Sequence, residues 1–382
     1  MLTRQRLVTY GIPVAAVATI ISAALLHKRL TSDAYVDVGT EPVTSIPSHQ
    51  VGTHQIDVVF AVDTTGSMGG LLDGAKRTVW SIASHIRKTD PDADLRIGLV
   101  AYKDIGDEYV TKPFSLTTDL DAVYGELASY TASGGGDTPE DVDAALDDSL
   151  HKMQWRDGAK KMLFVVGDAP PASRGEVPTY DKLAQEASTS GITINTIRCG
   201  WDSQTQLAFS RMAELGGGEF STIQQDGGVQ QVATPFDDQL AALSAQIDST
   251  VMVYGGEGAR TRYRGKMEAA KAAPSAAKAD RAAYYAKGGM KRGDDDFVGG
   301  VATGSLSIES VPEADLPTDM QGKDKAEIKA EVEKKVAERK VLQDKVADLA
   351  KQRDAYLANH AGDGEGGFDA KVKATVERQL KK

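Results

Sequence analysis

One short segment of the chain carries three oxygen-bearing side chains at regular spacing. A β-branched apolar run over residues 56–62 has the length and composition of a buried strand, and it gives way abruptly to Asp63, Thr65 and Ser67. Because these three residues sit two apart, their oxygens can converge on one point where the backbone is extended. Carboxylate and hydroxyl oxygens are hard ligands, which suit Mg²⁺, Mn²⁺ or Ca²⁺ rather than Zn²⁺. The segment therefore predicts a site for a divalent cation.

A second carboxylate follows another apolar strand. Residues 160–166 have strand character, and Asp168 comes directly after them. Strands alternate with helices throughout residues 54–250, which predicts an α/β fold with a mostly parallel sheet and helices on both faces. Ligands of such sheets bind beyond the carboxyl ends of the strands. Since Asp63 and Asp168 each follow such an end, we expect the two carboxylates to lie together.

The pattern Asp63-x-Thr65-x-Ser67 resembles the metal-ion-dependent adhesion site (MIDAS) of the von Willebrand factor A (VWA) domain, whose signature is Asp-x-Ser/Thr-x-Ser. The resemblance covers about half of the chain, and Thr65 stands where the family more often has Ser. It implies a Rossmann-like VWA domain over residues 54–250. It also implies two further ligands, Thr138 in the segment Gly-Gly-Gly-Asp-Thr-Pro-Glu and Asp168. The metal ligands implied are therefore Asp63, Thr65, Ser67, Thr138 and Asp168.

The ligand types predict what such a metal would do. Neutral hydroxyls leave much of the cation's charge in place, so the resemblance implies a protein partner whose exposed Asp or Glu completes the coordination of Mg²⁺. Mn²⁺ and Ca²⁺ are the other candidate metals. We expect a binding module rather than an enzyme, because the motifs supply no His or spare Glu as a general base. Two alternatives stay open: a hydrolase in which the cation activates water, and a structural protein that assembles through its C-terminal helix.

The N-terminus predicts a membrane segment. Residues 7–26 are uncharged and mostly apolar, with basic residues on both sides, and about 20 apolar residues span a bilayer as a helix. We favour an uncleaved transmembrane signal anchor over residues 1–29. The alternative is a signal peptide cleaved near Ala34, which would release a soluble exported protein. Both interpretations put the remainder of the chain outside the cytoplasm, in a periplasmic or extracellular location.

The other segments differ in composition from the sheet domain. Residues 30–53 are polar and contain two prolines, as is typical of a linker. Residues 251–322 are rich in Gly, Ala and Lys, and we expect a low-complexity, partly disordered linker with little core of its own. Residues 323–382 predict a helical region, and an apolar stripe runs along 323–357. In one interpretation this stripe packs on the rest of the chain or on a partner helix. In the other, more specific interpretation, it drives self-association of the protein as a coiled coil.

The overall composition excludes several classes of protein. A net charge of −11 argues against binding to nucleic acid or to anionic membrane surfaces. The single cysteine excludes an intrachain disulfide framework. We interpret the acidic residues of the segment 102–108 as a solvated loop rather than an accessory ion site.

Overall fold

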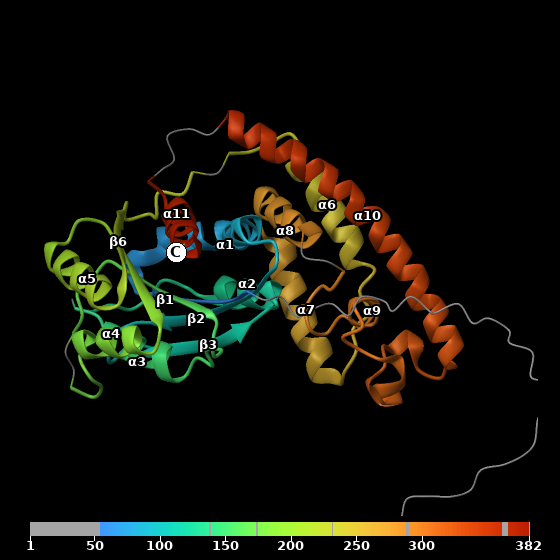
Figure 1. The fold of residues 1–382 in the computed structure, drawn as a ribbon, viewed down its shortest axis with the longest axis horizontal. Helices are drawn as coiled ribbons and strands as arrows, with labels where there is room; N and C mark the ends of the chain where they lie inside the picture. Colours follow the sequence, from blue (N-terminus) through green and yellow to red (C-terminus); the bar gives the residue numbers. More distant parts are fainter. Residues whose placement is uncertain are drawn as a thin grey trace, which may run out of the picture. The chain divides into compact units, whose positions relative to one another are not determined.

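The computed structural model describes residues 54–136, 139–172, 175–230, 232–287, 290–360 and 366–381. Six strands in these residues form one sheet in the order β3-β2-β1-β4-β5-β6, and β2 with β3 is its one antiparallel pair (Figure 1). The predicted α/β fold with a mostly parallel sheet is thus confirmed. The strands are β1 (His54–Asp63), β2 (Ala93–Tyr102), β3 (Thr111–Thr117), β4 (Lys160–Gly167), β5 (Ile192–Cys199) and β6 (Gly217–Ile223).

Helices cover both faces of the sheet. Side chains alternate along a strand, so Phe60 and Val62 of β1 belong to one core, and Val59 and Ala61 belong to the other. The first core is closed mainly by α1, α2 and α11, and the second by α3, α4 and α5. These helices are α1 (Gly69–Thr89), α2 (Leu120–Ser129), α3 (Val142–His151), α4 (Tyr180–Thr189), α5 (Ser203–Leu215) and α11 (Phe368–Leu380).

The helix α11, which completes the first face, comes from the end of the chain. Phe368, Val372 and Val376 are buried in the core between the sheet and α1. The ring of Phe368 lies 6.2 Å from the ring of Phe60 on β1. The sequence predicts a sheet domain over residues 54–250. Residues 368–380, from the predicted C-terminal helical region, provide part of the cover over its central strands.

The segment between β6 and α11 forms a second layer of helices: α6 (Asp237–Asp248), α7 (Glu257–Ala272), α8 (Ser275–Lys287), α9 (Phe297–Ala302) and α10 (Lys325–Asn359). Leu240 and Ile247 of α6 pack against Ala279 and Ala282 of α8. Residues 251–322 are therefore not the core-poor linker that their composition predicts. Their alanines bury little area each, but they let the helices approach closely enough to pack well.

The long helix α10 begins with a capping box in which Asp324 and Glu327 bond each other's backbone. Ile328 and Val332 of its apolar stripe pack against Phe297, and further along the helix Leu342 and Val346 pack against α6 and α8. The stripe is thus buried within this chain, as in the first of the two interpretations above. Self-association through residues 323–357 remains a hypothesis.

Buried ion pairs connect the helical layer to the sheet domain. Arg281 of α8 donates two hydrogen bonds, of 2.7 and 2.6 Å, to the carboxylate of Asp121 on α2, and both residues are buried. Lys266 of α7 binds Asp119, which also caps the N-terminus of α2. Losing one partner would leave a buried charge unpaired. The two layers are therefore held together by charge as well as by apolar contacts.

Among the residues that the structure describes, no helix combines the length and the apolar character needed to cross a bilayer. The predicted anchor over residues 1–29 and the linker over 30–53 lie outside the described residues.

Two valine substitutions test the role of α11. Val372→Ala removes two buried methyl groups from the core over the sheet, so we expect it to lower the free energy of unfolding by about 2 kcal/mol. Val341→Ala is the matched control, because Val341 is exposed on α10. It should change stability by less than about 0.5 kcal/mol. Chemical denaturation of both variants measures the difference, and equal effects would contradict the assignment of α11 to the sheet core.

Candidate metal centre

The site lies at the carboxyl end of β1, the strand between β2 and β4. Asp63 is the last residue of β1 and is fully buried beside Tyr102, its neighbour on β2. The Tyr102 hydroxyl donates to the carbonyl of Val166 on β4 at 3.1 Å, which places this ring across the floor of the site. A β-carbon at Gly167 would lie 2.3 Å from that hydroxyl, so only glycine fits just before Asp168.

Thr65 binds one oxygen of Asp63, and Ser67 lies next to Thr65. Thr65 donates from its backbone nitrogen at 2.8 Å and from its hydroxyl at 2.7 Å, both to Oδ1 of Asp63. The hydroxyl oxygens of Thr65 and Ser67 lie 3.4 Å apart, with Thr65 buried and Ser67 exposed. The turn after β1 is tight because the 3-10 helix Gly66–Met68 leads directly into α1.

Asp168 reaches the same point from β4. A glutamine of the loop after β6, Gln225, donates to Oδ2 of Asp168 at 2.5 Å and to the carbonyl of Ser67 at 3.4 Å. It therefore ties Asp168 to the first motif. The structure thus brings together Asp63, Thr65, Ser67 and Asp168, whereas Thr138 lies outside the described residues.

The surroundings of Asp63 disfavour the charged form of its carboxyl group. Burial raises the pKa of its carboxyl, the two Thr65 hydrogen bonds lower it, and the charge of Asp168 raises it further, to about 7 in total. Its second oxygen, Oδ2, is buried without a hydrogen-bond partner. A buried carboxylate oxygen is normally bonded, so this one marks the place where a cation or a donor belongs.

A further carboxylate near the site was missed by sequence reasoning. Glu140 is 4% exposed, and burial raises its pKa to about 8, with added repulsion from Asp63 and other acidic groups. Its one sequence signal is its place two residues after Thr138. An acidic residue just before a helix is ordinarily interpreted as part of the helix start.

The sequence predicts that the acidic residues of the segment 102–108, after β2, form a solvated loop. The structure shows instead that two of these residues are held by the protein. Asp104 is buried, and the carboxylate of Asp107 accepts hydrogen bonds from the backbone nitrogen of Gly135 at 3.1 and 3.2 Å. The backbone of Gly134 and Gly135 has φ values of +79° and +76°, which glycine adopts readily. Asp107 therefore holds the glycine loop beside Thr65 in a left-handed conformation.

Comparisons with known proteins agree with this arrangement. Residues 57–234 match the family profile of the von Willebrand factor type A domain. Over 208 residues the chain is 28% identical to von Willebrand factor A domain-containing protein 7 of Homo sapiens, which covers 51% of this chain and 22% of that protein. The Rattus norvegicus protein of the same name is 31% identical over 186 residues, or 48% of this chain and 18% of that protein. The chain thus spans less than a quarter of these relatives.

A solved structure of proximal thread matrix protein 1 from the mussel byssus, with a zinc-occupied MIDAS motif, covers 44% of this chain and 41% of its own. Its TM-score is 0.35 and its sequence identity is 14%. The family profile therefore assigns residues 57–234 to the class of VWA domains, and the mostly parallel sheet described above is consistent with that class. The zinc at the MIDAS motif belongs to the mussel byssus protein. For this chain, a divalent cation is what the resemblance of Asp63-x-Thr65-x-Ser67 to the MIDAS implies.

The residues present fit such a cation. Oδ2 of Asp63 offers an unused buried carboxylate oxygen, Asp168 adds a second carboxylate, and two hydroxyls stand beside them. In the described part of the chain, no three His, Cys, Asp or Glu side chains meet at one metal-binding point. A cation here would therefore depend on hydroxyl and water ligands as well, as suits Mg²⁺.

Metal addition should stabilise the protein. At 100 times its dissociation constant, a ligand of the folded state contributes about 2.7 kcal/mol, so millimolar Mg²⁺ should raise the melting temperature of the full chain. Mn²⁺, Ca²⁺ and Zn²⁺ should be compared in the same assay. Asp63→Asn should abolish the shift yet fold normally without metal, because it removes a repelled charge at nearly constant shape. Glu108→Gln, an exposed neighbour, should keep the shift. A shift that survives Asp63→Asn would exclude this site.

The affinity for Mg²⁺ should also depend on pH. A cation binds the ionised carboxylate and so competes with the proton on Asp63, whose pKa is raised to about 7 by burial and by Asp168. The dissociation constant should therefore be lowest at the alkaline end of the range. It should rise about tenfold for each pH unit below about 7. Isothermal titration between pH 5.5 and 8.5 measures this, and a constant affinity across that range would contradict it.

Proposed function

We propose that this protein is a divalent-metal-dependent binding module that captures an acidic side chain of a partner protein. The observation that carries the proposal is the buried, unpartnered Oδ2 of Asp63 beside Asp168, at an edge where neutral hydroxyls supply the other oxygens. Mg²⁺ is the metal we propose, with Mn²⁺ or Ca²⁺ as substitutes. Its ligands would be Asp63, Thr65, Ser67, Thr138 and Asp168, directly or through water.

The charge balance favours an acidic ligand in spite of the protein's acidic composition. Thr65 and Ser67 carry no charge, so two carboxylates face a doubly charged ion that still has coordination positions to fill. An ionised Asp or Glu is a harder and stronger ligand for such an ion than an amide or a hydroxyl. A carboxylate from a partner would therefore gain a metal bond that outweighs the repulsion from the surrounding acidic surface.

Exposed apolar residues around the same edge support a protein partner. Among the described residues four large apolar side chains are exposed, and three of them lie beyond the carboxyl ends of strands: Ile105, Trp201 and Leu207. Ile105 is on the loop after β2, Trp201 follows β5 and is 79% exposed, and Leu207 is in α5. Exposed tryptophan is a frequent energetic centre of protein interfaces.

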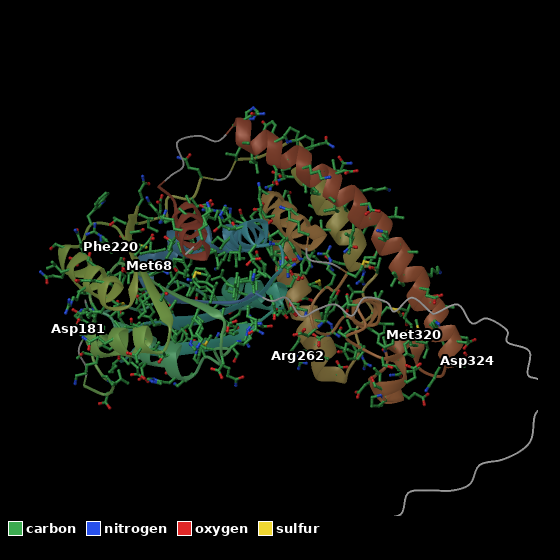
Figure 2. The ribbon with its side chains drawn as sticks, in the orientation of Figure 1. Met68, Asp181, Phe220, Arg262, Met320 and Asp324 are labelled. Atoms are coloured by element: carbon green, nitrogen blue, oxygen red, sulfur yellow. The ribbon has the colours of Figure 1, made fainter. Side chains whose placement is uncertain are left out.

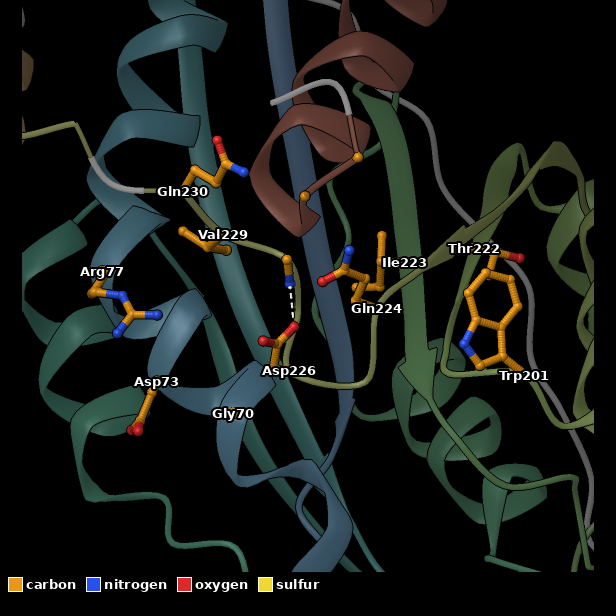
Figure 3. A pocket seen from close by; sticks show the side chains of 13 residues that line it. Gly70, Asp73, Arg77, Trp201, Thr222, Ile223, Gln224, Asp226, Val229 and Gln230 are labelled. Carbon is orange, nitrogen blue, oxygen red and sulfur yellow. Dashed lines mark hydrogen bonds between the residues drawn. The ribbon is translucent and has the colours of Figure 1, made fainter. Parts of the chain in front are cut away.

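A groove beside the site gives the partner more surface to contact. It has a volume of about 700 Å³ and runs between α1 and the loop after β6, with Trp201 at one side and Arg77 at the other (Figure 3). Asp226 lies between them and accepts a hydrogen bond from the backbone of Gly228. The groove adjoins Gln225, which contacts Asp168, so a segment bound at the metal could continue into it.

We propose a binding role rather than a catalytic one, since VWA domains mostly act as adhesion or scaffold modules. We also propose that residues 1–29 anchor the protein in a membrane and that the VWA domain faces the periplasm or the extracellular space. The uncharged stretch over residues 7–26 supports this proposal. Protease added to intact cells tests this orientation, because a domain outside the cytoplasm should be digested. Full protection of the domain would show that it faces the cytoplasm instead.

Capture of the partner should require the metal and the apolar rim together. With the full chain as bait on membrane extracts, we expect a partner that is retained in Mg²⁺, released by chelator and lost with Asp63→Asn. Trp201→Ala should weaken retention at least about tenfold, as for a buried interface tryptophan. Val341→Ala removes an exposed apolar side chain from α10 and is the control.

The partner itself provides the decisive variant. Replacing one of its Asp or Glu residues by the corresponding amide should abolish retention. A partner that stays bound both in chelator and to Asp63→Asn would exclude the metal as the bridge, and α10 would then be the surface to test.

A further inference from the structure

Glu140 is a buried carboxylate that the MIDAS signature does not include. The residue is 4% exposed, yet its Oε2 atom has no hydrogen-bond partner. A buried carboxyl oxygen without a hydrogen-bond partner is costly, and folded proteins rarely tolerate one without a functional reason. Of the buried carboxylate oxygens in the described residues that lack a partner, Oε2 of Glu140 and Oδ2 of Asp63 both belong to this end of the sheet.

The backbone of Glu140 is fastened to the loop that carries Asp168. Its nitrogen donates to the carbonyl of Pro170 at 3.1 Å, and its carbonyl accepts from the nitrogen of Ala172 at 2.8 Å. The two segments run parallel here, with Glu140 opposite Pro171. These backbone hydrogen bonds fix the position of Glu140 relative to the loop that begins at Asp168.

The side chain of Glu140 faces the first motif across the glycine loop. A β-carbon placed on Gly135 would lie 2.9 Å from Cβ of Thr65 and 3.2 Å from Oε1 of Glu140. Both side chains therefore lie close to Gly135, and a side chain at this position would crowd Thr65 and Glu140. The hydrogen bonds from Gly135 to Asp107 hold the loop in this place.

We infer that Glu140 is an outer-sphere carboxylate of the metal centre, which acts on the cation through water and tightens its binding. We assign it to the outer sphere because, among the described residues, Asp63, Asp168 and Glu140 do not form a group of three carboxylates that could hold a metal ion together. A carboxylate one water away still attracts the cation and orients the bound water by accepting its hydrogen bond. This inference rests on the metal-binding role proposed above.

Isothermal titration of the full chain with MgCl₂ tests this role. Glu140→Gln keeps the shape of the side chain and removes its charge. We expect it to weaken Mg²⁺ binding about 10- to 100-fold, as loss of an outer-shell partner typically does. Glu108→Gln removes a charge from the exposed acidic loop nearby and should weaken binding less than about threefold. Glu140→Asp keeps the charge but withdraws it by one carbon, and should give an intermediate loss.

The melting temperature without metal separates this role from a structural one. It should not fall in Glu140→Gln, since glutamine keeps the shape of the side chain and adds no charge at this buried position. Equal affinities for wild type and Glu140→Gln, or a loss no larger than that of Glu108→Gln, would overturn the inference and leave the metal site itself intact. If the wild type binds no Mg²⁺, the proposed function fails instead.

Discussion

The burial of the Asp63 carboxylate at the end of the central strand is the constraint on which the site depends. One oxygen is satisfied by Thr65, but the other has no partner and faces the charge of Asp168. Uncompensated buried charge is among the most expensive features a protein can carry. A divalent cation would turn this repulsion between carboxylates into attraction, so the same energy that strains the free protein would favour binding of the metal.

The surrounding loops are shaped to keep that arrangement in place. Tyr102 forms the floor, Asp107 holds the glycine loop, and Gln225 joins Asp168 to the backbone of Ser67. The scaffold beneath is a mostly parallel sheet, in which the five parallel strands β1, β2, β4, β5 and β6 all have their carboxyl ends at this edge. Figure 2 shows the described side chains on the ribbon, and Met68, buried in the core beside α1, is among those labelled.

The helical layer contributes to the site indirectly. Its buried ion pairs with α2 and the return of the chain as α11 cover the face of the sheet behind the metal loop. The nitrogen of Phe368, the first residue of α11, donates to the carbonyl of Gly227 at 2.8 Å, in the loop that also carries Gln225. The C-terminal region therefore reaches the border of the metal centre, and a change there can alter the position of Asp168's partner.

Short-range patterns in the sequence determined the class of fold and the first candidate ligands, because strand length, alternation and the Asp63-x-Thr65-x-Ser67 spacing act over a few residues. It also brought Asp168 to Asp63, since both follow parallel strands. Only the tertiary structure decided the place of Glu140, the role of Asp107 and the closure of the sheet by α11. The pairing of Asn195 with Gln379, 184 residues apart, is typical of what local pattern cannot predict. The composition of residues 251–322 predicts a linker with little core, and this prediction is wrong because the packing of these residues depends on the tertiary structure. Their stability comes from helices that pack closely against one another, not from the apolar content of any one helix.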